Sequence, residues 1–337
     1  MGDFRRAHDS FLRGFHYLTS GIDRWRLSEI ALRLGDTSRQ LEDFAGALRW
    51  YAAAQRHALS IKSIRLDLDA ATGRAMALRG LGRYGHALKI FNQLLRSYRR
   101  RRDNEGAAYI LWAMGTTERF SGRLAPACRH LRDAVTAYEK RNDASGLAYA
   151  RCGWGGTLRM MGFADASRQQ YALAYRTFRR ENDRFGMAYA SCGQANGLRM
   201  AGHLAEALPF MNRAERGYRA LRLSGPLAFV LWSRAQLFIE RGNWSAASRE
   251  LREADRAFRS SRDPRGLVYV ALGRAELARA RGLDSQAAYL RAAKAAGQLH
   301  LLLEKTHARV RAGLAPISLY RPLGVSIKDF SQYRSLP

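Results

Sequence analysis

The chain has 337 residues, and 47% of them are hydrophobic, so it holds ample material for a folded core. Lysine and arginine number 57 against 29 aspartate and glutamate, and the resulting net charge of +28 favours anionic partners. No apolar run reaches the length of a membrane span, and the N-terminus lacks the apolar core of a secretory signal. Three cysteines without paired spacing exclude a disulfide framework or a zinc site. We therefore expect a cytoplasmic protein that binds no cofactor.

The first part of the chain differs from the rest. Residues 1–24 carry charges throughout and are predicted to form an N-terminal helical extension. The following segment holds Phe44, Ala47, Tyr51 and Ala54 in the register of a repeat that becomes clear further on. Glu42 stands where the later units have glycine, so this first unit is degenerate.

From residue 82 onward, the same pattern returns every 40 residues. A glycine opens the register at Gly82, Gly122, Gly162, Gly202, Gly242 and Gly282. A small residue follows five positions later at Ala87, Ala127, Ser167, Ala207, Ala247 and Ala287. An aromatic residue follows sixteen positions after the glycine at Tyr98, Tyr138, Phe178, Tyr218 and Phe258. A fixed period of this length indicates stacked structural repeats.

Each unit is predicted to contain two helices. Aspartate side chains can cap the first helix, at Asp103, Asp143, Asp183 and Asp263. The glycine of the register ends that helix, where a left-handed residue is favoured. In the unit that lacks the aspartate, we expect Ser224 to cap and Pro226 to sit in the first turn. In one second helix, Tyr171, Ala174 and Phe178 share one face.

This pattern resembles the tetratricopeptide repeat, in its 40-residue variety. One unit supplies the small, glycine, alanine, apolar and alanine positions of that family as Gly115, Gly122, Ala127, Leu131 and Ala134. The family's leucine position departs from the pattern, since it holds Arg74, Met114, Trp154, Gln194, Arg234 and Arg274. The resemblance implies an all-α, right-handed superhelical solenoid of about seven helix-turn-helix repeats.

The domain organisation follows from the repeat. Residues 25–300 are predicted to form the solenoid, with its first and last units degenerate. Residues 301–337 then hold the end of the last helix and a segment that contains Tyr320, Phe330 and Tyr333. Three interpretations stay open for this segment: a cap on the last unit, a ligand mimic in the groove, or a loose tail.

Residue patterns of known catalytic sites are missing from the sequence. The eight histidines are scattered and make no metal-binding spacing. The stretch GWGG at 153–156 lies inside a predicted helix and lacks the Lys-Ser/Thr of a phosphate loop. We expect a protein that is not an enzyme.

Without a catalytic pattern, we expect the function to be binding through the surface of the solenoid. In the resembled family the first helix of each unit lines the concave groove, which implies an arginine column beside an aromatic column. The predicted binding residues are Arg79, Arg119, Arg159, Arg199, Arg279, Tyr109, Tyr149, Tyr189, Tyr269, Trp112 and Asn196. Arginine forks bind carboxylates or phosphates, and aromatic faces stack on apolar groups or arginine. Alternatively, the tyrosines form core between units, and the arginines are solvated or paired with Glu118 and Glu240.

A second basic ladder is predicted on the second helices, which form the convex side in that family. It consists of Arg96, Arg176, Arg216, Arg256 and, one turn later, Arg179, Arg219, Arg259. It suits a polyanion that wraps the solenoid, a second partner, or a solvated face.

Three functions are consistent with these features. The leading hypothesis is a protein–protein interaction scaffold or adaptor that binds an acidic or amphipathic segment of a partner protein in the groove. A second hypothesis is RNA binding, as a ribonucleoprotein subunit that uses the basic ladders. A third is a regulator that senses a peptide or ligand, although no DNA-binding helix-turn-helix motif precedes the repeats.

Overall fold

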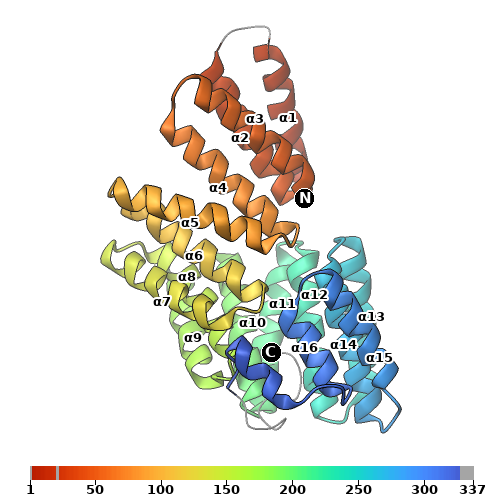
Figure 1. Ribbon diagram of the computed structural model, residues 1–337. Coiled ribbons are helices and arrows are strands. Elements are labelled where there is room, and N and C mark those ends of the chain that lie inside the picture. Colours follow the sequence, from red (N-terminus) through yellow and green to blue (C-terminus); the bar gives the residue numbers. More distant parts are fainter. Residues whose placement is uncertain (1, 20–22, 327–337) are drawn as a thin grey trace. The chain divides into compact units, whose positions relative to one another are not determined.

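The computed structural model describes residues 2–19 and 23–326, and it is all-helical over these residues. Phe330 and Tyr333 lie outside the described residues. The helices, shown in Figure 1, are α1 (Gly2–Thr19), α2 (Arg24–Gln40), α3 (Phe44–Ser60), α4 (Ile64–Gly80), α5 (Tyr84–Arg100), α6 (Asn104–Phe120), α7 (Leu124–Lys140), α8 (Ala144–Met160), α9 (Ala164–Arg180), α10 (Arg184–Met200), α11 (Leu204–Ala220), α12 (Ser224–Glu240), α13 (Trp244–Ser260), α14 (Pro264–Ala280), α15 (Gln286–Gln298), α16 (Leu302–Arg311) and the 3₁₀ helix η1 (Ile317–Leu323).

The helix lengths explain the 40-residue period. Each helix from α2 to α14 has 17 residues, and three residues separate it from the next up to α14. Two helices of 17 residues and two three-residue turns make 40 residues. Seven successive pairs run from α2/α3 to α14/α15, so the predicted fold class of about seven helix-turn-helix repeats is confirmed.

The chain divides into two compact units, residues 1–117 and 118–337. In unit 1, α1 packs on α2, and α2 to α5 pack in sequence order. In unit 2, successive helices from α7 to α16 pack on one another, and first helices also contact the next first helix, as in α10 with α12 and α12 with α14. Each unit is therefore a stack of helix pairs in the manner of repeat proteins.

The turns behave as the sequence predicts, with one exception. The register glycines have φ between 71° and 97°, which is the left-handed region that ends the first helix. Aspartate caps are present, for example Asp143, whose carboxylate accepts from the Gly146 amide at 2.8 Å. The expected cap at Ser224 is wrong, because Ser224 is already helical and Leu223 before it makes no side-chain cap hydrogen bond.

Glycines near the start of the first helices make room for aromatic rings. A Cβ on Gly146 would lie 2.4 Å from the Tyr138 ring, and one on Gly186 would lie 2.3 Å from the Phe178 ring. The ring at the end of each second helix thus presses against the backbone of the next first helix. This contact explains why Asp, Gly and the aromatic residue recur together.

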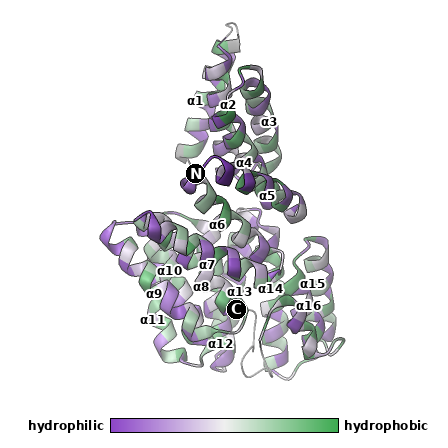
Figure 2. Cartoon of the chain, turned by 60° about the vertical axis from the view of Figure 1, so that its left-hand side comes forward, coloured by the Kyte–Doolittle hydropathy of each residue, from purple (hydrophilic) through white to green (hydrophobic). Residues whose placement is uncertain are grey.

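Apolar and polar residues alternate along the helices of both units (Figure 2). In the part of the chain that the structure describes, no helix is long and apolar enough to cross a membrane.

Candidate functional site

The predicted binding residues of unit 2 lie on its first helices and on the last turn of α6, and we call this surface the first-helix face. Its members are Arg119, Arg159, Arg199, Arg279, Tyr149, Tyr189, Tyr269 and Asn196. Side chains of one first helix reach the next: the Asn196 amide donates to Ser233 Oγ at 3.1 Å, and Tyr149 donates to Asp183 at 2.6 Å. Because the pairs repeat every 40 residues, equivalent positions lie side by side along the stack.

In unit 1, three predicted residues come together. Arg79 donates to Thr116 Oγ1 at 3.0 Å, and its guanidinium lies 5.9 Å from the Trp112 ring centroid. The rings of Tyr109 and Trp112 are 5.5 Å apart. These groups already bind one another and form a local cluster on α4 and α6.

Arg119 and Arg159 are the unsatisfied arginines of the first-helix face. Both side chains are half-buried, and among the described residues neither forms an ion pair or hydrogen bond. Arg119 Nε and both Nε and Nη1 of Arg159 are buried without a hydrogen-bond partner in the described part of the chain. Buried donors normally find acceptors, so these two guanidinium groups are suited to an anionic ligand.

Glycines create the space in which Arg119 lies. A Cβ on Gly156 would lie 2.1 Å from Arg119 Nη1 and 3.0 Å from the Tyr171 hydroxyl. The Tyr171 ring comes from α9 and fits against Gly155 of α8 and Gly193 of α10. Burial raises the pKa of Tyr171, while the charges of Arg159 and Arg119 act in the opposite direction.

Arg199 occupies the same column but is already paired with a carboxylate. Its side chain is buried and donates to Glu240 at 2.6 Å. The equivalent positions 41 residues after Arg119 and Arg159 are Met160 and Met200, which offer no charge. An acidic residue at this offset is the sequence signal that separates Arg199 from its neighbours. Arg279 is exposed and lies 3.6 Å from Glu276.

The tyrosine column largely fills the space between helix pairs. Tyr149 packs edge-on against Phe178 at 4.8 Å, and Tyr189 packs edge-on against Tyr171 at 6.2 Å between ring centroids. Tyr149 and Tyr189 stay half-buried, whereas Tyr269 is buried. Burial raises the pKa of Tyr269 to about 12, so its hydroxyl is a hydrogen-bond donor at neutral pH.

The cysteines offer no reactive thiolate on this face. Among the described residues all three are free of disulfides, and Cys152 is buried. Burial raises the pKa of Cys152, and it raises the pKa of Cys192 to about 11. Protonated thiols are poor nucleophiles at neutral pH. The described residues also hold no group of three or more side chains placed to bind a metal ion.

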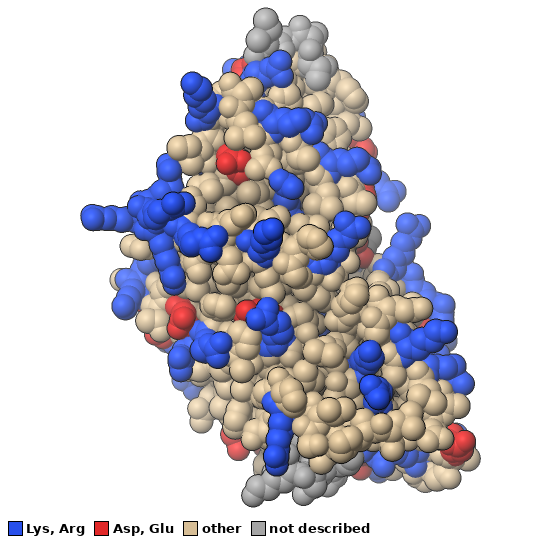
Figure 3. All heavy atoms as spheres, viewed as in Figure 1, with Lys and Arg blue, Asp and Glu red and all other residues tan. Residues whose placement is uncertain are grey.

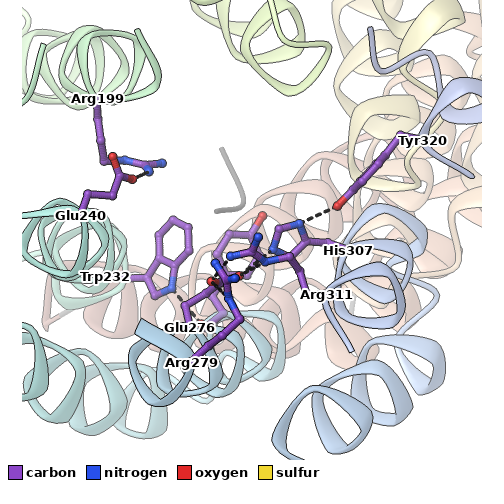
Figure 4. Close-up of polar contacts among 9 residues, drawn as sticks. Arg199, Trp232, Glu240, Glu276, Arg279, His307, Arg311 and Tyr320 are labelled. Carbon is purple, nitrogen blue, oxygen red and sulfur yellow. Dashed lines mark hydrogen bonds and ion pairs between the residues drawn. The ribbon is translucent and has the colours of Figure 1, made fainter. Parts of the chain in front are cut away.

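A buried polar network lies at the end of the first-helix face that α14 forms (Figure 4). Glu276 accepts from Arg311 Nε at 2.9 Å and Nη2 at 2.5 Å, and from His307 Nε2 at 3.2 Å. His307 Nδ1 is 2.7 Å from the Tyr320 hydroxyl. Because a carboxylate only accepts, His307 carries its proton on Nε2, and neutral Nδ1 accepts from Tyr320. Burial lowers the pKa of His307, which favours this neutral form.

The histidine network was missed at the level of sequence, since His307 and Arg311 lie beyond the regular repeat. Glu276 carries the one available signal, because it holds the position that Asn196 occupies in its own unit. An ionisable residue at a buried position of the repeat indicates a hydrogen-bonding or ionic partner that lies outside the repeat.

The predicted second ladder is exposed throughout: Arg96, Arg176, Arg216, Arg256, Arg179, Arg219 and Arg259. Arg219 bridges Glu215 and Glu253, and Arg259 pairs with Asp255. Arg176, Arg179 and Arg216 have no ion-pair partner among the described residues. Figure 3 shows the wider context, with many Lys and Arg side chains and few Asp and Glu on one face.

Comparison with known proteins places this geometry in a structural class. No protein-family model matches the sequence, and no curated protein sequence is significantly similar. A Rap protein complexed with Competence and Sporulation Factor is similar in structure, with a TM-score of 0.64, 14% identity and coverage of 88% of this chain and 82% of that chain. The Rap conjugation gene regulator of plasmid pLS20 in complex with the Phr* peptide gives a TM-score of 0.67, 17% identity and coverage of 82% and 75%.

A third similar structure is aspartyl phosphate phosphatase F from Bacillus subtilis, with a TM-score of 0.55, 14% identity and coverage of 82% of this chain and 78% of that chain. At such identities the likeness concerns the fold. Together with the 40-residue helix-pair repeat, it shows that the chain is a tetratricopeptide-type solenoid.

Proposed function

We propose that this protein is a non-enzymatic adaptor whose unit 2 binds an acidic or amphipathic segment of a partner protein along the first-helix face. One observation carries the proposal: Arg119 and Arg159 have buried guanidinium nitrogens without a hydrogen-bond partner in the described residues. An unsatisfied buried donor costs about 1–3 kcal/mol, and more when it is charged. A carboxylate from a ligand would remove this cost through paired hydrogen bonds.

The arrangement of the face supports a peptide as the ligand. Arg119 and Arg159 lie one repeat apart, so an extended chain could present successive groups to them. The half-buried rings of Tyr149 and Tyr189 lie ten residues before Arg159 and Arg199 on the same helices, and they offer apolar contact further along the first-helix face. Two of the similar structures are complexes with a named peptide or factor, which supports peptide-type recognition on this fold.

The first test uses two labelled peptide probes, one alternating glutamate with leucine and a neutral version with glutamine in place of glutamate. The variant Arg119→Gln/Arg159→Gln should lose at least tenfold in affinity for the acidic probe, since charged hydrogen bonds contribute about 1.5–3 kcal/mol each. Fluorescence anisotropy measures the affinity. The matched control Arg176→Gln/Arg216→Gln removes the same charge from exposed second-helix positions.

The control decides between specific and general attraction. If both double variants lose affinity equally, the probe responds to net charge and the first-helix face is not the site. If wild type does not prefer the acidic probe to the neutral one, the assignment of an acidic ligand is wrong.

A second candidate function is RNA binding through the exposed arginines Arg176, Arg179 and Arg216, which have no ion-pair partner in the described part of the chain. Single-stranded RNA that contacts Z phosphates should show a log–log salt slope of about −0.7Z. Replacing these three arginines with glutamine should flatten that slope for a labelled poly(U) probe. Absence of retention at low salt would discard this candidate.

A further inference from the structure

Residues 301–326, which comprise α16, η1 and the three residues after it, connect the two ends of unit 2, and we call them the C-terminal strap. In a stack of helix pairs each pair contacts only its neighbours, so a contact between the ends is an additional feature. The strap packs on the α6–α7 turn, where a Cβ on Gly122 would lie 3.1 Å from Leu302 Cβ. It also reaches the α8–α9 turn, where the Ser326 amide donates to the Met161 carbonyl at 2.9 Å.

Apolar side chains of the strap are buried in one cluster with residues that flank these turns. Leu301, Leu303, Leu323 and Val325 share one buried cluster with Leu124 of α7 and Met160 of α8. Near its end, the strap approaches α7 closely, since a Cβ on Gly324 would lie 3.1 Å from the Ala125 amide nitrogen.

The other end of the strap is anchored on α14. Glu304 accepts from the Tyr269 hydroxyl at 2.9 Å and lies 3.8 Å from Arg265. Arg311 and His307 hold Glu276, as Figure 4 shows. The anchor on α14 is therefore ionic and buried, whereas the contact with the α8–α9 turn includes one backbone hydrogen bond.

The strap covers the turns that follow the two unsatisfied arginines. Gly122 comes three residues after Arg119, and Met161 comes two residues after Arg159. The nitrogens of Arg119 and Arg159 that lack partners are buried in this closed arrangement. A ligand can therefore form hydrogen bonds with them only after part of the surrounding structure moves away.

We propose that the C-terminal strap is a lid that closes the first-helix face and that an acidic partner segment displaces it from the α6–α7 and α8–α9 turns. This inference rests on the proposed function. If the open form is a minor state, the apparent dissociation constant equals the intrinsic constant divided by the open fraction. A variant that opens the lid about tenfold more often should therefore bind about tenfold more tightly.

The release variant is Gly324→Leu in the full chain. Gly324 has φ of 85° and lies against Ala125, so a leucine there pushes the strap off α7. The matched control is Gly313→Leu, because Gly313 has φ of 75° but nothing within 4 Å of an added Cβ. Hydrogen exchange of the strap amides reports opening, and anisotropy with the alternating glutamate–leucine probe reports affinity.

A locked variant tests the same lid in the opposite direction. Met161→Cys/Ser326→Cys places thiols on two residues joined by a backbone hydrogen bond, and free-thiol titration measures how much of the disulfide forms on oxidation. The oxidised form should bind the probe at least tenfold more weakly than wild type, and reduction should restore binding. The single variant Ser326→Cys under the same oxidant controls for the native cysteines.

The expected result is faster strap exchange and tighter binding in Gly324→Leu, neither in Gly313→Leu, and loss of binding in the oxidised lock. If the oxidised lock binds the probe as well as wild type while Arg119→Gln/Arg159→Gln still loses it, the lid is wrong and the proposed function stands. Probe binding that also ignores the arginine substitutions would overturn the proposed function and the lid with it.

Discussion

Tyr171 shows at the scale of single residues how glycines inside helices shape the candidate site. Its ring occupies space that side chains at Gly155 and Gly193 would fill, and its hydroxyl lies beside Gly156. The sequence places these glycines inside predicted first helices. It does not reveal which ring enters the gap, because Tyr171 belongs to a second helix whose inward reach depends on the angle between helices.

Two glycine substitutions should therefore have different effects on stability. A Cβ on Gly193 would lie 2.2 Å from the rigid Tyr171 ring, so Gly193→Ala should lower the free energy of unfolding by about 1–3 kcal/mol. Gly156→Ala meets the mobile end of Arg119 and gains helix propensity, so its unfolding free energy should stay within about 1 kcal/mol of wild type. Urea unfolding measures both. Equal destabilisation would contradict the distinction between ring and guanidinium.

Glu276 should make the free energy of unfolding depend on pH. Burial alone would raise its pKa, but hydrogen bonds from His307 and Arg311 lower it to about 2. The unfolded carboxyl takes up its proton near pH 4.5, so its contribution is complete above that pH and disappears as pH falls toward 2. Glu276→Gln should therefore be less stable than wild type at pH 7, and the difference should shrink between pH 4.5 and 2. A constant difference across this range, in urea unfolding at each pH, would show that the carboxylate is not the cause.

The arginine column shows the limit of prediction at this scale. Arg119, Arg159 and Arg199 have the same repeat position, so the sequence pattern treats them alike. Their environments differ because Glu240 reaches Arg199, whereas the other two have methionine at the same offset. Burial and pairing depend on the residue one repeat further on, which a single column does not show.

At the scale of elements, the repeat specifies where helices end. Aspartate predicts the start of the first helix and glycine predicts its end, and the structure has both at these turns. The path of the C-terminal strap could not be predicted, because α16 and η1 lie outside the register and are positioned by contacts far away in sequence.

The two kinds of turn differ in backbone angle, and this gives a prediction at the same scale. Gly242 has φ of 73°, and an added Cβ would meet nothing within 4 Å, so Gly242→Ala should cost about 1 kcal/mol through backbone strain alone. Arg262 already places an L-residue at φ of 52°, so Arg262→Ala should change the unfolding free energy by less than about 0.5 kcal/mol. Thermal unfolding compares the two. A loss at Arg262 that matches the loss at Gly242 would show that the turn does not discriminate between them.

At the scale of the whole molecule, the net charge of +28 should make stability depend on ionic strength. Like charges on the surface repel in the folded state, and this repulsion destabilises the compact form. Salt screens exposed charges, since the Debye length falls from about 30 Å at 0.01 M to about 10 Å at 0.1 M. Buried pairs such as Arg199–Glu240 are screened much less, so they should not cancel this effect.

The midpoint of thermal unfolding should therefore rise by several degrees as sodium chloride increases from about 0.02 M to 0.3 M. Because the chain has two compact units, the midpoint of each transition is followed separately. A neutral osmolyte at equal osmolality is the control, since it changes solvent exclusion without screening charge. A midpoint that falls with salt would mean that surface ion pairs such as Arg219–Glu253 stabilise the fold more than the excess arginines oppose it. The general attraction to anions on which both candidate ligands depend would then be weaker than the net charge suggests.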